Sequence, residues 1–430
     1  MRLATMTDPT VSREPADLTL QVRRADLLAA VGRVLDYRPT QEVSHHGRVA
    51  ALGASVASRL GGVDPREAFY AGLVHDVGLL DEQWDLSHPL NLAEQPNRAV
   101  TRAHPLVGAQ MLADVPRLLG AAEIVLDHHE WVDGHGYPRG KSGEEVPWGA
   151  QVLRLADTCD FLLREQGTPE RLAFVDAVRS RAAHQVTDET LDAGVDALNQ
   201  PGFYAQLLAG DDVDLLVRST IEHLACDDFV RTGAELTALL ELLATVADAH
   251  ASDHIGHSRR VANLVVMVAM AMGLADEETA KAKWAALIHD LGMVAVPKTL
   301  LDEPRLLSEK ELRNIRNRSA RVSPLLGPVE GLDEVIRIAG AHREAFDGSG
   351  CPEHLSGSAI PLGARLIAVC DTYDALTSRR PYRAARDTSL AVDILIRGSG
   401  GMFDPDVVSA AVPVFLISEP ADTDREPAWS

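Results

Sequence analysis

The sequence contains an internal duplication. The dipeptide His75-Asp76 recurs as His289-Asp290, at an offset of 289 − 75 = 214 residues. Other pairs that keep this offset are His128 and His342, Asp133 and Asp347, Asp157 and Asp371, and Pro147 and Pro361. His45 in HHGRVA matches His257 in HSRRVA at 257 − 45 = 212, so one short indel separates the copies. Such a sustained register predicts two similar units in tandem.

Both copies are predicted to be helical. Val49, Leu52 and Val56 follow His45 at a spacing of three or four residues, which places them on one helix face. The segments that run into LVHDVG and LIHDLG are each expected to form a helix ending at the glycine after His-Asp. Alternating strand patterns are scarce. The predicted fold class is therefore all-α, with two tandem helical domains.

The repeat and the polar, proline-containing ends give the predicted boundaries. In chain order they are a disordered N-terminus at 1–19, a first domain at 20–200, a helical linker at 201–234, a second domain at 235–415 and a disordered tail at 416–430.

Charge and composition exclude several classes of partner. A net charge of −22 over 430 residues argues against binding long nucleic acid through a basic surface. A small phosphorylated ligand remains compatible, because a metal ion can dominate the local charge. The most apolar run, 262–275, is too short to span a bilayer, so no membrane partner is expected. Four cysteines without a CxxC pair indicate reduced thiols and a cytoplasmic location.

Histidines and aspartates of the first unit form a predicted site for divalent metal ions. The candidates, each expected at a helix end or turn, are His45, His75, Asp76, His104, His128, His129 and Asp157. An adjacent His-Asp pair can serve two ions, with the aspartate bridging them. His46 competes with His45 for one role, and the repeat favours His45. Asp160 and Glu130 each either orient an imidazole or are solvated surface acids.

The first unit resembles the HD-GYP family, a branch of the HD phosphohydrolases. The motifs that carry the resemblance are His75-Asp76, His104-Pro105, His128-His129-Glu130 and Asp133-Gly134-x-Gly136-Tyr137-Pro138. The resemblance implies HD-type helical domains that bind two or three iron or manganese ions and hydrolyse cyclic di-GMP or a related cyclic dinucleotide. It also implies that the seven candidates are metal ligands and that Asp76 is catalytic as the bridging ligand. Zinc also accepts this ligand set.

The Gly-Tyr-Pro turn is expected to contribute to substrate binding through Gly134, Gly136 and Tyr137. Both glycines permit positive φ and a tight reversal, which can hold the two histidines before it. Tyr137 either stacks on a base, bonds a phosphate, or packs against a neighbouring helix.

The first unit also departs from the family pattern. The family's phosphate-binding lysine, three residues after the His-Asp aspartate, is replaced by Leu79, and by Met293 in the second unit. Gln41 stands where members with a third metal carry a carboxylate. A dinuclear site is therefore favoured over a trinuclear one, and the missing cation puts the catalytic rate in question.

The second unit has lost more of the ligand set. Arg318 replaces His104, Arg343 replaces His129 and Cys351 replaces Tyr137. A guanidinium is always charged and cannot donate a lone pair to a metal. Either the two arginines stand where the second ion would be, or they point to solvent. The residual site, with at most one ion, consists of His257, His289, Asp290 and Asp371.

These observations favour a cyclic dinucleotide phosphodiesterase whose first domain is catalytic and whose second is regulatory or structural. The alternatives are a catalytically weak or inactive module that senses a nucleotide or docks a protein, and a phosphohydrolase for a linear nucleotide. A signalling protein or a second copy of the chain is the expected protein partner.

Overall fold

The computed structural model describes residues 21–37, 44–79, 99–167, 169–209, 213–224, 228–250, 255–297, 300, 308, 322–326, 329–378 and 386–417. The predicted disordered N-terminus and all but the first two residues of the predicted tail lie outside them, as do Gln41 and Arg318.

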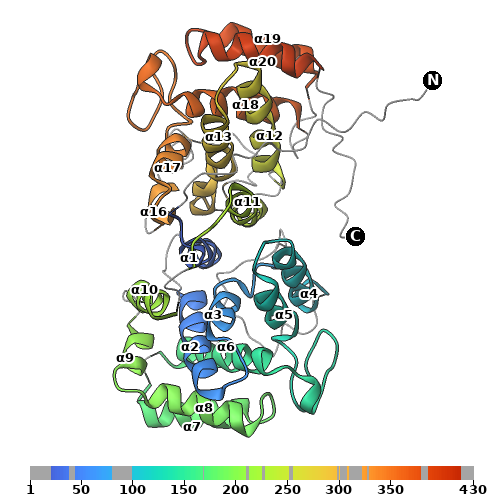
Figure 1. Ribbon diagram of the computed structural model, residues 1–430, viewed down its shortest axis with the longest axis vertical. Coiled ribbons are helices and arrows are strands. Elements are labelled where there is room, and N and C mark those ends of the chain that lie inside the picture. The colour runs from blue at the N-terminus through green and yellow to red at the C-terminus, as the bar shows by residue number, and fades with distance from the viewer. Residues whose placement is uncertain are drawn as a thin grey trace, which may run out of the picture.

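Figure 1 shows two helical bundles stacked along the long axis of the molecule. The helices of the first bundle and of the segment after it are α1 Arg24–Asp36, α2 His45–Leu60, α3 Pro65–Val74, α4 Ala99–Ala113, α5 Leu119–Asp127, α6 Trp148–Gln166, α7 Arg171–Ala182, α8 Asp188–Asn199, α9 Phe203–Leu208 and α10 Val213–Leu224, with the 3-10 turn η2 Gly143–Glu145. The helices of the second bundle are α11 Gly233–Ala249, α12 His257–Ala271, α13 Asp276–Ile288, α16 Val322–Leu326, α17 Asp333–Gly340, α18 Leu362–Thr377, α19 Thr388–Gly398 and α20 Pro405–Ile417, with the 3-10 turns η4 Leu291–Ala295 and η6 Gly357–Ala359.

The fold is all-α, as predicted. Strand-like pairing among the described residues is limited to two isolated bridges, Arg23 with Phe229 and Ser399 with Phe403. None of the described helices combines the length and the apolar character that crossing a membrane requires.

The two bundles repeat the same packing. In the first, α2 packs on α3 and α6, and α5 packs on α3, α4 and α6. In the second, α12 packs on α13 and α18, and α17 packs on α13, α16 and α18. The turns η2 and η6 begin 357 − 143 = 214 residues apart, which is the offset of the sequence repeat. The candidate metal-binding residues of the two units therefore lie among equivalent helices.

Close backbone contact between α2 and α3 fixes the relative position of these two helices, which carry or precede candidate ligands of the first unit. A Cβ on Gly72 would lie 2.4 Å from the Cα of Ala50, so only glycine permits the observed distance between these helices. Asp64 starts α3 by accepting a hydrogen bond from the backbone N–H of Arg66 at 2.9 Å, with Pro65 at the first helical position.

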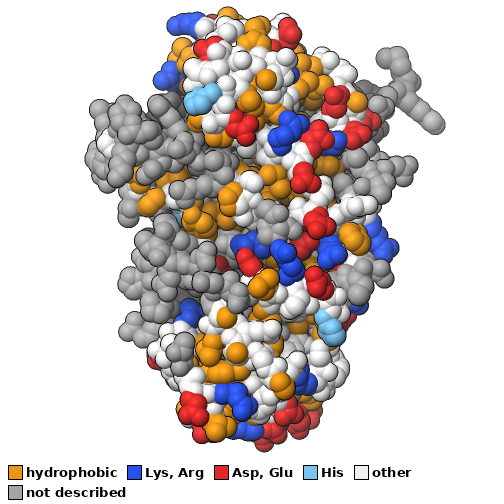
Figure 2. Space-filling model, turned by 90° about the vertical axis from the view of Figure 1, so that its left-hand side faces the viewer, with side chains coloured by type: hydrophobic (Ala, Val, Ile, Leu, Met, Phe, Trp, Pro, Cys, Tyr) orange, Lys and Arg blue, Asp and Glu red, His pale blue; other side chains and the backbone are white. Residues whose placement is uncertain are grey.

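Helix α1 lies between the bundles (Figure 1) and packs on helices of both, α2 and α3 on one side and α11 and α16 on the other. The segment predicted as a helical linker contains α9 and α10, and α10 packs on α2 of the first bundle. On the face in Figure 2, the described Lys and Arg side chains are interspersed with Asp and Glu rather than gathered in a patch.

Candidate metal centre

The seven candidate ligands of the first unit come from five places in the fold and are all buried. Those at helix ends or turns are His45 at the start of α2, His75 and Asp76 after α3, and His128 and His129 after α5. His104 and Asp157 lie inside α4 and α6. The prediction that every ligand lies at a helix end or turn is wrong for these two, because α4 and α6 turn their buried faces toward the cluster.

The His-Asp pair follows its helix instead of closing it. The α3 helix ends at Val74 and α13 ends at Ile288, each directly before its histidine. The prediction that each helix runs to the following glycine is therefore wrong. The chain leaves α3 in a turn in which the N–H of Val77 bonds the carbonyl of Val74 at 3.0 Å. This turn directs His75 and Asp76 into the same space.

Hydrogen bonds at Nδ1 orient the imidazoles. The Nδ1 atoms of His75, His104 and His128 lie 3.0, 2.6 and 2.6 Å from the carbonyl oxygen three residues earlier. His45 is oriented by Asp160, whose carboxylate oxygen lies 2.6 Å from its Nδ1. A proton on Nδ1 leaves the lone pair on Nε2, which is the atom offered to a metal.

Asp160 therefore orients an imidazole, which settles one of the two open assignments. The second, Glu130, is buried but orients none. Its carboxylate accepts hydrogen bonds from the backbone N–H groups of Arg139 at 2.5 Å and Lys141 at 2.8 Å. Glu130 thus ties down the chain that follows the Gly-Tyr-Pro turn.

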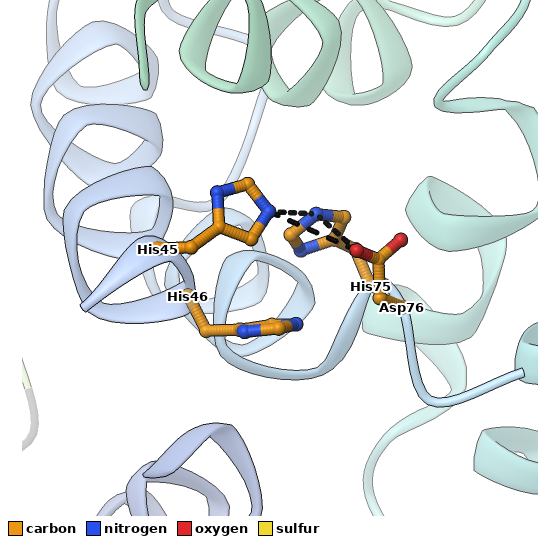
Figure 3. Close-up of side chains that lie close together, drawn as sticks. All are labelled: His45, His46, His75 and Asp76. Carbon is orange, nitrogen blue, oxygen red and sulfur yellow. Dashed lines mark hydrogen bonds and ion pairs between the residues drawn. The ribbon is translucent and has the colours of Figure 1, made fainter. Parts of the chain in front are cut away.

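The Asp76 carboxylate lies between two pairs of imidazoles. In one pair, the Nε2 atoms of His45 and His75 are 3.1 Å apart, and in the other, those of His104 and His128 are 3.2 Å apart. Oδ2 of Asp76 lies 3.6 Å from Nε2 of His75, while its Oδ1 lies 3.5 Å from Nε2 of His104. Figure 3 shows Asp76 and His75 side by side, with the His45 ring turned toward both. One carboxylate can thus serve two ions, one at each pair.

Burial and neighbouring groups together shift the pKa values of this cluster. Burial lowers the pKa of His75 to about 4 and also lowers that of His104, while the pKa of His128 falls well below its usual value. Burial by itself would raise the pKa of the Asp76 carboxyl, but the imidazoles around it, His75 foremost, hold it well below its usual value. Burial likewise opposes the charge on His45, but the Asp160 carboxylate outweighs it and raises the pKa of His45 to about 10.

The residues present fit divalent metal ions. His104 and His128 are neutral and both use Nδ1 against a carbonyl, so two Nε2 lone pairs face each other at 3.2 Å. Two facing lone pairs repel unless a cation lies between or beside them. An anionic carboxylate next to neutral imidazoles is the donor set that divalent transition metals prefer.

Arg154 lies at this candidate site, although no motif in the sequence singles it out. Its guanidinium is buried, with Nη1 2.9 Å from Nδ1 of His129 and 3.2 Å from Oδ2 of Asp157. His129 is therefore held by a donor, unlike the other imidazoles. A comparison of the two copies could have drawn attention to Arg154, because the second unit has Ala368 at the equivalent position, 368 − 154 = 214 residues later.

The Gly-Tyr-Pro turn packs directly on candidate ligand histidines. The ring of Tyr137 stacks on His129 with 4.6 Å between centroids and 23° between planes. Arg102 is an exposed residue of α4, and its guanidinium carbon lies 5.5 Å from the centre of the Tyr137 ring. Of the alternatives for Tyr137, the structure shows packing on a ligand and on an arginine of the neighbouring helix.

The two glycines of the turn serve different needs. Gly134 uses the positive φ that glycine permits, at +82°. Gly136 does not adopt positive φ. A Cβ there would lie 2.3 Å from the backbone nitrogen of Trp131, so Gly136 is required by a close backbone approach.

Replacing Gly136 with alanine is expected to destabilise the protein by about 1–3 kcal/mol, because the turn would have to move away from the preceding backbone. Gly340→Ala is a suitable control, since a Cβ there meets nothing within 4 Å and its φ is not positive. That variant is expected to be neutral or slightly stabilising. Urea denaturation measures both, and equal midpoints for the two variants would contradict the close approach.

The position of the missing lysine is apolar. Leu79 is 8% exposed and Met293 is 4% exposed, so both side chains pack into the protein. Among the described residues, Arg154 and Arg102 are the cations that lie at the wall formed by His129 and Tyr137.

The second unit brings its residual candidates together around an arginine. His257 bonds Asp374 through Nδ1 at 2.7 Å, as His45 bonds Asp160, and its Nε2 lies 3.3 Å from Asp371. His289 and His342 bond the carbonyl three residues earlier, each at 2.7 Å. These residues and Asp290 form two groups that could each hold a cation, His257–His289–Asp371 and His289–Asp290–His342.

Arg343 points into this cluster. Its Nε donates to Nε2 of His342 at 2.9 Å, and its Nη2 lies 3.3 Å from Asp371 and 3.8 Å from Asp290. Of the two alternatives for Arg343, these contacts exclude the side chain that points to solvent, and the side chain is only about one-third exposed. The prediction for Arg318 falls outside the described residues.

Comparisons with known proteins agree with this geometry. A family model described as HD domain matches residues 29–186 and again residues 241–407. The 3′3′-cGAMP-specific phosphodiesterase 3 of Vibrio cholerae serotype O1 is 30% identical over 306 residues, which are 69% of this chain and 64% of that protein. The 3′3′-cGAMP-specific phosphodiesterase 1 of the same organism is 26% identical over 393 residues, 85% of each chain.

A solved structure has the same fold. A crystal structure of a cyclic GMP-AMP specific phosphodiesterase from V. cholerae aligns with a TM-score of 0.63 at 21% identity, covering 92% of this chain and 98% of that one. The family matches cover well over half of the sequence. The chain belongs to the HD domain family, and its first unit carries the motif set that distinguishes the HD-GYP branch.

Proposed function

We propose that this protein is a metal-dependent phosphodiesterase that hydrolyses a cyclic dinucleotide at a dinuclear site in its first unit. The observation that carries the proposal is the placement of the Asp76 carboxylate between two imidazole pairs, with one oxygen facing each pair. The relatives that match most of the chain are named for hydrolysis of 3′3′-cGAMP, and a shorter match is named for cyclic di-GMP.

Each imidazole pair defines one ion. His45, His75, Asp76 and Asp157 would hold the first ion, and His104, His128 and His129 would share Asp76 to hold the second. When bound, two such ions supply an activated water and neutralise charge that develops on a phosphodiester. Iron and manganese suit this mixed set of imidazoles and carboxylates, and zinc is compatible with it.

The protein residues around the ions supply orientation and charge. Asp160 and the helix carbonyls fix the rings of the imidazoles that use Nδ1 as a donor, so these rings need no reorientation on binding. His129 accepts from Arg154 at Nδ1 and would give up a proton from Nε2 to bind an ion. Arg154 holds Asp157 and His129 from the buried side. The Tyr137 ring covers one face of the His129 ring.

Arg102 is exposed and lies at the Tyr137 ring, and we assign it the role of the missing lysine in contacting substrate phosphate. Replacing it with alanine is expected to raise KM for a cyclic dinucleotide about tenfold, because one charge-assisted hydrogen bond is lost. Arg102→Lys should recover part of that loss. A steady-state titration of both variants measures the effect, and an unchanged KM in Arg102→Ala would contradict the assignment.

The second unit is proposed to be non-catalytic, with the guanidinium of Arg343 in place of the second ion. Its contacts with Asp290, Asp371 and His342 satisfy charges and lone pairs that a metal would otherwise satisfy. The proposed role of this unit is regulatory or structural.

The activity is tested by incubating the purified full-length chain with Mn²⁺ or Fe²⁺ and with cyclic di-GMP or 3′3′-cGAMP, then identifying the products by mass spectrometry. Conversion of at least one substrate to a linear product, lost on chelation and restored by metal, is expected. Tight binding of both nucleotides without cleavage by the metal-loaded protein would favour a sensor.

A further inference from the structure

His46 is a buried imidazole that the proposed ligand set does not use. It is the second residue of α2 and is 4% exposed. Its ring centre lies 4.9 Å from that of His45 and 4.9 Å from that of His75. Figure 3 shows its ring reaching along the cluster beneath His45 and toward His75. The side chain therefore lies at the edge of the first ion position.

Asp36 fixes the orientation of this imidazole. Its two carboxylate oxygens accept hydrogen bonds from the backbone N–H of His46 at 3.0 Å and from Nδ1 at 2.7 Å. With Nδ1 used in this way, the Nε2 lone pair remains. Nε2 of His46 is buried and has no hydrogen-bond partner among the described residues. A buried polar atom without a partner costs free energy unless something binds it.

The second unit shows that the imidazole is not needed to start the helix. Ser258 occupies the position of His46 at the offset 258 − 46 = 212. Its backbone N–H and its hydroxyl bond the two oxygens of Asp248 at 3.0 and 2.6 Å. A serine thus completes the same aspartate cap, and the ring in the first unit supplies an additional nitrogen.

We propose that Nε2 of His46 is a further ligand of the ion at His45, His75 and Asp76, a role that rests on the metal site proposed above. One ligand atom from each of these four residues lies within 4.8 Å of the other three. A carboxylate bonded to Nδ1 of an imidazole whose Nε2 meets a metal is a recurring arrangement in metalloproteins. The additional imidazole nitrogen would strengthen the binding of this ion.

The test is Mn²⁺ binding to the metal-free, full-length His46→Ser variant, measured by calorimetry without substrate. Serine reproduces the cap that Ser258 makes, so folding is preserved. One of the two ions is expected to bind about 10–100-fold more weakly, while the affinity for the other is unchanged. In the Co²⁺-loaded protein, the visible absorption spectrum should change with the loss of one nitrogen ligand.

His223→Ser, at an exposed position of α10, is the matched control and should bind both ions like the wild type. Unchanged Mn²⁺ affinities and an unchanged Co²⁺ spectrum in folded His46→Ser would show that His46 is only a core residue paired with Asp36. A wild-type chain that binds fewer than two ions would instead overturn the dinuclear site itself, whatever His46 does.

Discussion

Asp76→Asn is expected to reduce cyclic dinucleotide hydrolysis by about a thousandfold or more. The Asp76 carboxylate is 8% exposed and faces both imidazole pairs, so its charge is shared by the two proposed ions. Asparagine keeps the size of the side chain but removes the charge and places an amide N–H₂ against imidazole lone pairs. The loss is therefore electrostatic and not a consequence of altered packing.

The matched control is Asp290→Asn in the second unit, at the equivalent position of the repeat. It should leave turnover unchanged, because Arg343 already stands among the ligands there. Initial rates at saturating Mn²⁺ compare the two variants with the wild type. Equal losses in both would mean that the second unit also takes part in the reaction.

Arg24→Ala is expected to lower the free energy of unfolding by about 3–5 kcal/mol, the largest stability effect predicted for this chain. Arg24 is 2% exposed, and its guanidinium bonds both Asp228 and Glu235. Tyr70 of α3 donates to the same Asp228, and burial raises the pKa of its phenol to about 12, which keeps the donor proton in place. Removing the guanidinium leaves the buried carboxylate of Glu235 and the half-buried carboxylate of Asp228 without their cation.

This network ties the two bundles together, because Arg24 lies on α1, Tyr70 on α3 and Glu235 on α11. Arg66→Ala is the control, since its ion pair with Asp64 is exposed and should contribute less than about 1 kcal/mol. Urea denaturation followed by circular dichroism measures both. A loss for Arg24→Ala no larger than that for Arg66→Ala would show that the network adds little to stability.

The helical fold and the clustering of the candidate ligands could be predicted from the sequence, because motifs that recur at a constant offset are unlikely to match by chance. A lone His-Asp pair has many uses, but His75-Asp76 and His289-Asp290 recur at one offset together with four further pairs. The three- and four-residue spacing after His45 and His257 likewise predicts helices, and α2 and α12 begin at these residues.

What the sequence could not show is how each ligand is held. Arg154 reaches His129 across 25 positions of the chain, and Asp36 reaches His46 across 10, contacts that depend on how helices pack. The predicted ends of these two helices are wrong. His75 and His289 are cap residues that still have helical φ and ψ, and no local residue preference marks the residue at which each helix ends. Gly136 illustrates the same limit, since its close approach to Trp131 appears only in three dimensions.

If the first unit alone holds the dinuclear site, as proposed, each chain loaded with metal contains two ions. Inductively coupled plasma mass spectrometry of the purified wild type, Asp76→Asn and Asp290→Asn after loading with Mn²⁺ gives the count. We predict two ions in the wild type, fewer than two in Asp76→Asn and two in Asp290→Asn. Four ions in the wild type, or a count that falls in Asp290→Asn and not in Asp76→Asn, would show that the dinuclear site is not confined to the first unit.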